Sequence, residues 1–281
     1  MASRALPPPY KDIEDLVRVE RLPTIWCPGC GIGIVFKTLL KAIKEYGDDI
    51  DRHVIVSGIG CAGRFAGYVR LDGYHVLHGR AIPFAVGLKL SKPQLEVTVV
   101  SGDGDIVGIG GNHFIHAARR NHDINVVLIN NLVYGMTGGQ LAPTTPLGAR
   151  TMTSPYGNIE HPVNIPLLAS AAGATYVARW SVFHVEQMKR SFLKMFKHKG
   201  FSVIEIISPC VIYARRNRME ILDMYELLRK MCKVKQNPDP REGEIDIVSG
   251  KPVVLGEFVS IEKPTYESLY SELVEKVRKN E

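Results

Sequence analysis

LEVTVVSGDGD (Leu95–Asp105) and INVVLINN (Ile124–Asn131) are the two stretches that decide the fold of this chain. Each begins as a short run of mostly β-branched residues and ends in small or polar ones, which is typical of a buried strand. Gly110–Asn121, between them, has the composition of a helix. Continuous apolar strands that alternate with helices predict an α/β fold, a doubly wound parallel sheet covered on both faces.

The same alternation extends on both sides of this core. Further helices are expected at Gly33–Tyr46, Ala81–Leu90, Ile165–Gly173 and Val182–Lys199, and further strands at His53–Ser57, Ala174–Ala178 and Ser202–Ser208. We therefore expect one large domain over residues 31–209.

The two ends of the chain differ in character from this domain. Residues 1–30 are expected to form an N-terminal arm, extended over residues 1–26 because these are Pro-rich and charged. Residues 210–281 are expected to form a C-terminal extension that contacts a partner. It contains a charged helix at Met219–Lys233 and a hairpin around Ser249–Pro252.

Composition narrows the class of protein. The net charge is +6 and the pI about 9.0, but aromatic residues are not interleaved with the basic ones and no nucleic-acid-binding module is present. The basic patches are expected to be solvated surface, or a landing area for an acidic protein. Apolar runs such as Val126–Ile129 are too short to span a bilayer, and Met1–Tyr10 does not resemble a signal peptide. We expect a cytoplasmic protein.

A phosphate and metal site is expected at the ends of the two strands quoted above, the one before Gly102 and the one before Asn131. Asp103 follows one strand and Asn131 the next, and open α/β sheets bind ligands at the carboxyl ends of their strands. Gly108–Gly111 then precedes a helix, whose N-terminus favours an anion such as a diphosphate. Asp103 and Asn131 offer the hard oxygen ligands that Mg²⁺ prefers. Taken singly, Gly-Asp-Gly would indicate a turn and Asn-Asn a strand end.

The cysteines suggest a second site. Cys27 and Cys30 precede a helix, and Cys61 and Cys210 each follow a predicted strand. Four such ligands suit Zn²⁺ or an iron–sulfur cluster. A thioredoxin-like role for Cys27–Cys30 is disfavoured because no apolar strand precedes the pair. Cys232, in the charged helix, is expected to be a buried apolar residue.

These motifs resemble a known family. GDG followed by the Asn130–Asn131 pair resembles the motif of thiamine diphosphate (ThDP)-dependent enzymes. The whole set resembles the β subunit of 2-oxoacid:ferredoxin oxidoreductases. It comprises WCPGCGIG (Trp26–Gly33), GIGC (Gly58–Cys61), HGRA (His78–Ala81), GDGD (Gly102–Asp105), GGNH (Gly110–His113), ARRN (Ala118–Asn121), NNLVYGMTGGQ (Asn130–Gln140) and SPC (Ser208–Cys210).

The resemblance implies cofactors and their ligands. It implies Mg²⁺ held by Asp103, Asn131 and the Val133 carbonyl, and a [4Fe–4S] cluster held by Cys27, Cys30, Cys61 and Cys210. The residues it places around ThDP are Gly60, Cys61, His78, Gly102, Asp103, Gly104, Asp105, Asn131, Val133, Tyr134, Gly135 and Thr137.

The resemblance also implies a reaction and partners. A 2-oxoacid, CoA and oxidised ferredoxin give acyl-CoA, CO₂ and reduced ferredoxin. A partner α subunit supplies the pyrimidine-binding domain and the activating glutamate, in an αβ or (αβ)₂ assembly. Arg64 resembles a residue that meets the distal end of the substrate, which favours 2-oxoglutarate over pyruvate; an ion pair at a surface is the alternative. A non-redox ThDP decarboxylase or synthase with structural cysteines is the competing function.

Overall fold

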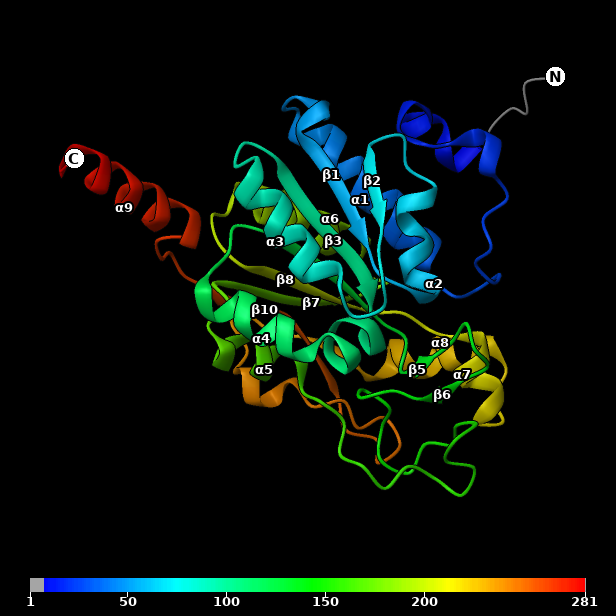
Figure 1. Ribbon diagram of the computed structural model, residues 1–281. Helices are drawn as coiled ribbons and strands as arrows, with labels where there is room; N and C mark the ends of the chain where they lie inside the picture. Colours follow the sequence, from blue (N-terminus) through cyan, green and yellow to red (C-terminus); the bar gives the residue numbers. More distant parts are fainter. Residues whose placement is uncertain (1–7, 281) are drawn as a thin grey trace.

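A computed structural model describes residues 8–280 of the chain. Its centre is an eight-stranded sheet in the order β2-β1-β3-β4-β8-β7-β10-β9 (Figure 1). Neighbouring strands run parallel except β10 and β7, which are antiparallel. The strands are β1 His53–Ser57, β2 Asp72–His75, β3 Glu96–Gly102, β4 Asn125–Asn130, β7 Tyr176–Ser181, β8 Ser202–Ile207, β9 Cys232–Val234 and β10 Val253–Ser260.

Helices cover both faces of the sheet, as a doubly wound fold requires. One apolar core contains buried residues of α1 (Ile32–Tyr46) and α6 (Val185–Lys197). The other contains buried residues of α3 (Ala81–Ser91), α4 (Gly111–Arg120) and α5 (Ile165–Ala172). Within residues 8–280, no helix is both long and apolar enough to cross a membrane.

The predicted elements are confirmed from α1 to β8, with ends that differ by up to three residues. The sequence did not predict the small pair β5 (Val133–Tyr134) and β6 (Gln140–Leu141), nor β2, which pairs with β1 at the edge of the main sheet. Its four residues, Asp-Gly-Tyr-His, are all exposed. A solvated edge strand of this composition carries no apolar alternation, and Asp72 and Gly73 there indicate a turn instead.

The N-terminal expectation is wrong for part of the arm. Residues Pro8–Leu16 form 3₁₀ turns, and Ile13, Leu16 and Val17 are buried in the core beside α1. Val17 also forms a β-bridge with Val69. The apolar spacing of these residues therefore outweighs the prolines and charges around them. Residues 1–7 lie outside the described residues. They include the start of the expected arm and most of Met1–Tyr10, the segment that was expected not to be a signal peptide.

The C-terminal segment also differs from expectation. The charged helix is present as α8 (Ile221–Met231), but the hairpin around Ser249–Pro252 is wrong. β9 and β10 pair in parallel, and β10 extends the main sheet by pairing with β7. Residues 249–252 are the turn before β10. The single strand β10 is eight residues long and mostly buried, so the sheet, rather than a local turn, determines its partner.

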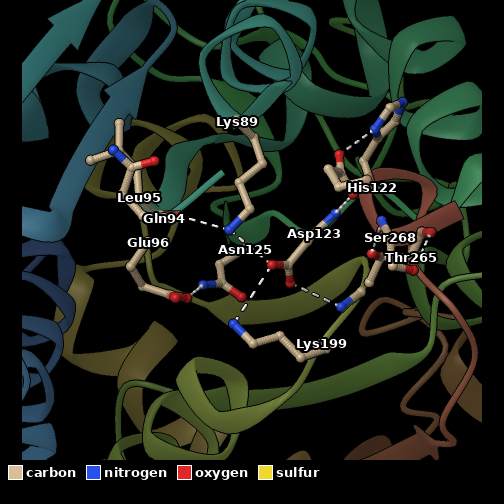
Figure 2. Close-up of polar contacts among 12 residues, drawn as sticks. Lys89, Gln94, Leu95, Glu96, His122, Asp123, Asn125, Lys199, Thr265 and Ser268 are labelled. Atoms are coloured by element: carbon tan, nitrogen blue, oxygen red, sulfur yellow. Dashed lines mark hydrogen bonds and ion pairs between the residues drawn. The ribbon is translucent and has the colours of Figure 1, made fainter. Parts of the chain in front are cut away.

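A network of charged and polar side chains lies at the amino ends of β3 and β4 (Figure 2). Lys89 reaches Asp123 at 2.8 Å and Asn125 donates to Glu96 at 2.6 Å. Burial raises the pKa of Glu96 to about 7. Lys199 approaches the same Asp123 carboxylate at 3.6 Å. The network joins α3, β3 and β4 at the amino ends of the strands. The loops that follow the strands lie at the opposite end of the sheet.

The last helix, α9 (Tyr266–Asn280), is attached to the body at its first turn and then projects away from it (Figure 1). The Glu267 carboxylate lies 2.8 Å from His122 Nδ1 and accepts a hydrogen bond from the Asp123 N–H at 3.0 Å. Glu267 is only 8% exposed. This one side chain therefore contributes much of the attachment of α9.

Replacing Glu267 with Ala is expected to release α9 from the body. Two buried donors lose their acceptor, and hydrogen bonds to a charged group contribute about 1–3 kcal/mol. Hydrogen exchange of residues 266–280 should accelerate, and chemical denaturation should show a lower free energy of unfolding. Glu272→Ala, in an exposed position on the same helix, should change neither; equal effects of both substitutions would contradict the assignment.

Candidate functional site

A cavity of about 110 Å³ opens at the carboxyl ends of β1, β3 and β4. We call it the diphosphate cavity. All twelve residues that the sequence placed around a cofactor line it. They are Gly60, Cys61, His78, Gly102, Asp103, Gly104, Asp105, Asn131, Val133, Tyr134, Gly135 and Thr137. Ile59, Ala62 and Met136 complete the lining. Residues as distant in the sequence as Ile59 and Thr137 are thus brought together because parallel strands end at the same edge of the sheet.

Three polar groups converge in this cavity: the Asn131 side-chain amide, the Val133 carbonyl and the Asp103 carboxylate. The Asn131 side-chain oxygen lies 2.7 Å from the Val133 carbonyl oxygen and 3.2 Å from Asp103 Oδ1. Turning the amide round would let its NH₂ group donate to both oxygens. As oriented, the three acceptors fit a cation. Adjacent oxygens around an octahedral Mg²⁺ ion are about 3 Å apart, since each lies about 2.1 Å from the metal.

Asp103 is held in an environment that disfavours its bare charge. Its side chain is 2% exposed, and burial raises its pKa to about 7. Thr144 donates its hydroxyl proton to Asp103 Oδ2, which leaves Oδ1 to face Asn131. A bound divalent cation would stabilise the carboxylate and reverse the pKa shift.

Sequence reasoning missed Thr144 and Thr145. The Thr145 hydroxyl donates to the Leu132 carbonyl at 2.6 Å, so the pair holds both the aspartate and the turn after Asn131. Two threonines in a loop, followed by a proline, carry no signal of their own. Only the folding of the loop over residues 142–158 brings them under the cavity.

Two glycines, Gly60 and Gly104, let the backbone itself form part of the cavity wall. A Cβ on Gly104 would lie 2.3 Å from the Tyr134 ring, and the Tyr134 hydroxyl donates to the Gly104 carbonyl at 3.1 Å. Gly104–Ile109 forms a π-helical turn, a feature often found at functional sites. Gly60 has a φ of +87° with no atom within 4 Å of its Cβ direction. The backbone there faces open space, as close approach to a ligand requires.

Asp105 and His78 hold the rim together. Asp105 Oδ1 accepts from the N–H groups of Ile59 at 3.3 Å and Gly79 at 2.8 Å, and His78 Nδ1 lies 2.5 Å from it. Asp105 is 2% exposed. Its carboxylate therefore binds the two loops that carry Gly60 and His78, whereas Asp103 faces the metal-binding oxygens.

The four cysteines from the sequence line a second cavity, of about 240 Å³, which we call the cysteine cavity. Its other lining residues include Trp26, Asn131, Gly135 and Met136. Among residues 8–280, no three His, Cys, Asp or Glu side chains are arranged to hold a single metal ion. Four thiols around one cavity match the number of ligands that a [4Fe–4S] cluster takes, in which each thiolate binds a different iron.

Local contacts place the cysteine loops. Trp26 Nε1 donates to the Cys61 carbonyl at 2.8 Å, and the Ser208 hydroxyl donates to the Cys30 carbonyl. Gly31 has a φ of +79°, and a Cβ there would lie 2.9 Å from Ser208 Oγ. Burial, with the nearby Cys210 as a smaller cause, raises the pKa of Cys61 to about 11. Metal ligation would therefore displace a proton from this thiol.

Gly135 lies between the two cavities. A Cβ on Gly135 would lie 3.3 Å from Asn131 Nδ2, 3.4 Å from Cys210 Sγ and 4.0 Å from Cys61 Sγ. Cys61, Asn131, Gly135 and Met136 line both cavities. The two sites are therefore separated by single residues, a short distance for electron transfer.

Arg64 and Cys232, the two remaining residues singled out in the sequence, do not line either cavity. Arg64 follows the short helix α2 (Gly60–Gly63) that carries Cys61, and its side chain is exposed. Cys232 is the first residue of β9, directly after α8 rather than within it, and it is buried in the core and lines neither cavity. Its position agrees with the expectation that it is an apolar core residue.

Comparison with known proteins identifies the family. Residues 58–206 match the thiamine pyrophosphate enzyme, C-terminal TPP binding domain family. The 2-oxoglutarate synthase subunit KorB of Methanocaldococcus jannaschii is 46% identical over 265 residues, 93% of this chain and 97% of that protein. Its counterpart in Archaeoglobus fulgidus is 52% identical over 208 residues, 74% of this chain and 78% of that one.

This chain belongs to the 2-oxoacid:ferredoxin oxidoreductase β-subunit family. A solved 2-oxoglutarate:ferredoxin oxidoreductase from Magnetococcus marinus, with 2-oxoglutarate, coenzyme A and succinyl-CoA bound, supports the assignment. Its matching chain superimposes with a TM-score of 0.83 at 31% identity, over 94% of this chain and 89% of that one. The α/β domain of this chain is accordingly a ThDP-binding domain.

Asp103→Asn is expected to remove Mg²⁺-dependent ThDP binding. The substitution keeps the shape of the side chain but withdraws the only carboxylate among the three converging oxygens. Outer-sphere substitutions weaken metal binding by about 10–100-fold, and loss of a direct ligand should exceed that. Isothermal titration calorimetry with ThDP and Mg²⁺ measures the effect. Asp239→Asn, which affects only a surface pair with Arg241, is the control; unchanged affinity in the Asp103 variant would refute the ligand assignment.

Proposed function

We propose that this chain is the β subunit of a 2-oxoglutarate:ferredoxin oxidoreductase, which catalyses CoA-dependent oxidative decarboxylation. The reaction converts 2-oxoglutarate, CoA and oxidised ferredoxin into succinyl-CoA, CO₂ and reduced ferredoxin. The observation that carries the proposal is the shared wall between the two cavities, because it joins a diphosphate and metal site to four cysteines. A decarboxylase that uses no electron acceptor has no need of this juxtaposition.

The chain's own residues anchor one end of the cofactor. Asp103, Asn131 and the Val133 carbonyl would hold Mg²⁺, and the glycine-lined loops after β1 and β3 would surround the diphosphate. When bound, ThDP supplies a carbon nucleophile and an electron sink for decarboxylation. Tyr134 covers Gly104 and helps to exclude water from the metal-binding oxygens.

The cysteine cavity would hold one [4Fe–4S] cluster through Cys27, Cys30, Cys61 and Cys210. Such a cluster accepts and releases single electrons. Cys61 lines both cavities, so its thiolate would lie on the direct path from the cofactor to the cluster.

A partner α subunit would complete the active site. The acidic side chains that line the diphosphate cavity are Asp103 and Asp105. The first faces the metal site and the second binds two loops, so neither is free to activate the aminopyrimidine. The activating glutamate and the pyrimidine-binding domain would therefore come from the α subunit.

The C-terminal segment offers a surface for such a partner. On α9, beyond its attachment to the body, Leu269, Tyr270, Leu273 and Val277 are each at least 50% exposed. Their spacing of three or four residues places them along one side of the helix. An apolar stripe of this kind on a projecting helix fits a subunit contact, in an αβ or (αβ)₂ assembly.

Electrons would leave on the side of Cys27. Its side chain is exposed and lines an open groove of about 590 Å³ together with Cys30. Lys37, Lys41 and Lys189 also line the groove. Basic side chains beside an exposed cluster ligand fit the approach of an acidic electron carrier such as ferredoxin.

Arg64 would contact the substrate. Gly60, Cys61 and Ala62 of α2 line the diphosphate cavity and lie within one helical turn of Arg64. The Arg64 side chain is exposed. An Arg matches a carboxylate with two hydrogen bonds. The distal carboxylate of 2-oxoglutarate, which pyruvate lacks, suits this partner.

The assembled αβ enzyme, purified without oxygen, should contain iron and acid-labile sulfide, and it should reduce ferredoxin in a CoA-dependent reaction that is faster with 2-oxoglutarate than with pyruvate. Cys61→Ser should remove the cluster and ferredoxin reduction while ThDP still binds, because a hydroxyl is a poor ligand for iron. Cys232→Ser is the matched control and should keep both, since that thiol lies in the core. A colourless preparation with stoichiometric zinc, or decarboxylation that needs no electron acceptor, would overturn the proposal.

Arg64→Ala should raise the KM for 2-oxoglutarate by about tenfold, because a charge-assisted hydrogen bond contributes about 1.5–3 kcal/mol. The KM for pyruvate should change much less. Arg70→Ala, which breaks only an exposed pair with Glu20, is the control. Equal changes for both substrates would show that Arg64 does not bind the distal carboxylate.

A further inference from the structure

A chain of three buried polar side chains crosses three neighbouring strands of the sheet. Arg179 on β7 donates through Nε to Glu205 Oε2 on β8 at 2.7 Å. Asn130 at the end of β4 donates through Nδ2 to Glu205 Oε1 at 2.7 Å. Arg179 and Asn130 are 0% exposed and Glu205 is 1% exposed. Nothing in the reaction proposed above uses a charged pair at this depth.

The chain ends at the metal-binding turn. Asn130 Oδ1 accepts a hydrogen bond from the Leu132 N–H at 3.1 Å, which closes a turn around Asn131. Leu132 has a φ of +69°, a left-handed conformation that a leucine rarely adopts. The surrounding contacts must therefore impose it. They are the Asn130 side chain on one side and the Thr145 hydroxyl, bound to the Leu132 carbonyl, on the other.

This turn determines where two of the three converging oxygens lie. Asn131 and Val133 flank Leu132, and their oxygens are 2.7 Å apart. If Asn130 moved, the turn would relax and those oxygens would separate. Glu205 prevents this by binding the Asn130 amide, and Arg179 holds Glu205 in place.

Stability alone does not explain such a network. A buried ion pair is often no more stable than apolar residues of the same size, because both charges lose their hydration. Here both Nη atoms of Arg179 are buried with no hydrogen-bond partner among the described residues. The arrangement therefore costs stability that a purely structural role would not require.

We propose that Arg179, Glu205 and Asn130 are positioning residues that hold the Asn131 amide oxygen and the Val133 carbonyl in a geometry suited to a divalent cation. This inference rests on the Mg²⁺–ThDP site of the proposed function. The three side chains touch neither cofactor nor substrate; they act through the turn.

Glu205→Gln in the assembled αβ enzyme tests the proposal. A glutamine presents one oxygen and one NH₂ group, so it accepts from either Asn130 or Arg179 but not from both. Mg²⁺-dependent ThDP affinity, measured by isothermal titration calorimetry, should fall by about tenfold, as for other substitutions behind a metal ligand. Mn²⁺ binding, followed by electron paramagnetic resonance, should weaken in parallel.

Glu96→Gln is the matched control. Glu96 also accepts a hydrogen bond from a buried Asn, Asn125, at 2.6 Å, but at the amino ends of the strands (Figure 2). The substitution at Glu205 should weaken Mg²⁺ and ThDP binding, whereas the substitution at Glu96, which alters the same kind of buried contact at the opposite ends of the strands, should not. A loss of affinity in both variants would mean that general destabilisation is responsible, and the inference would fail.

Glu205→Asp separates position from charge. It keeps the negative charge beside Arg179 but withdraws the carboxylate from Asn130 by one methylene. Affinity should fall here as well, and this variant keeps the test open if the glutamine variant does not fold. Wild-type affinity in either folded Glu205 variant would overturn the inference. Failure of the wild-type enzyme to bind ThDP with Mg²⁺ would instead refute the proposed function.

Discussion

The convergence of three oxygen atoms at the end of the sheet is the constraint on which the site depends. The Asn131 side-chain amide lies 2.7 Å from the Val133 carbonyl oxygen and 3.2 Å from Asp103 Oδ1, an arrangement that is satisfied either by a bound cation or by rotation of the amide. The surrounding structure holds these groups together. Thr144 restrains the carboxylate, and Thr145 and Asn130 restrain the turn between the other two oxygens. The protein thus assembles the metal geometry from contacts that lie behind the ligands.

The cysteine cavity lies at the same end of the sheet, directly beside the diphosphate cavity. A Cβ on Gly135 would lie 3.3 Å from Asn131 Nδ2 and 3.4 Å from Cys210 Sγ, because the loop after β4 passes between the two cavities. A side chain there would press on both. The absence of a Cβ therefore allows a metal–diphosphate site and a cysteine site to share one wall, and this proximity makes single-electron transfer physically reasonable.

The sequence predicted the parts of this structure that have a local signal. Uninterrupted apolar runs such as Val126–Ile129 identified the central strands, and the polar residues after them identified the cavity edge. Thr144 and Thr145 were missed because their role depends on a loop that folds back from a distant position. The edge strand β2 was missed because it is solvated, and the buried turn around Ile13 because prolines and charges surround it. The contacts of Thr144, Thr145 and β2 are tertiary, and no period or spacing encodes them.

The two ends of β4 show how one kind of contact serves different purposes. An Asn on β4 donates to a buried Glu at each end, Asn125 to Glu96 and Asn130 to Glu205. At the amino end the glutamate lies near lysines and burial raises its pKa to about 7, so the pair belongs to the charged network that joins the helices to the sheet. At the carboxyl end the glutamate is paired with Arg179 and the Asn side chain closes the metal-binding turn. Because the hydrogen bond is the same, the difference in function must come from what lies beyond it.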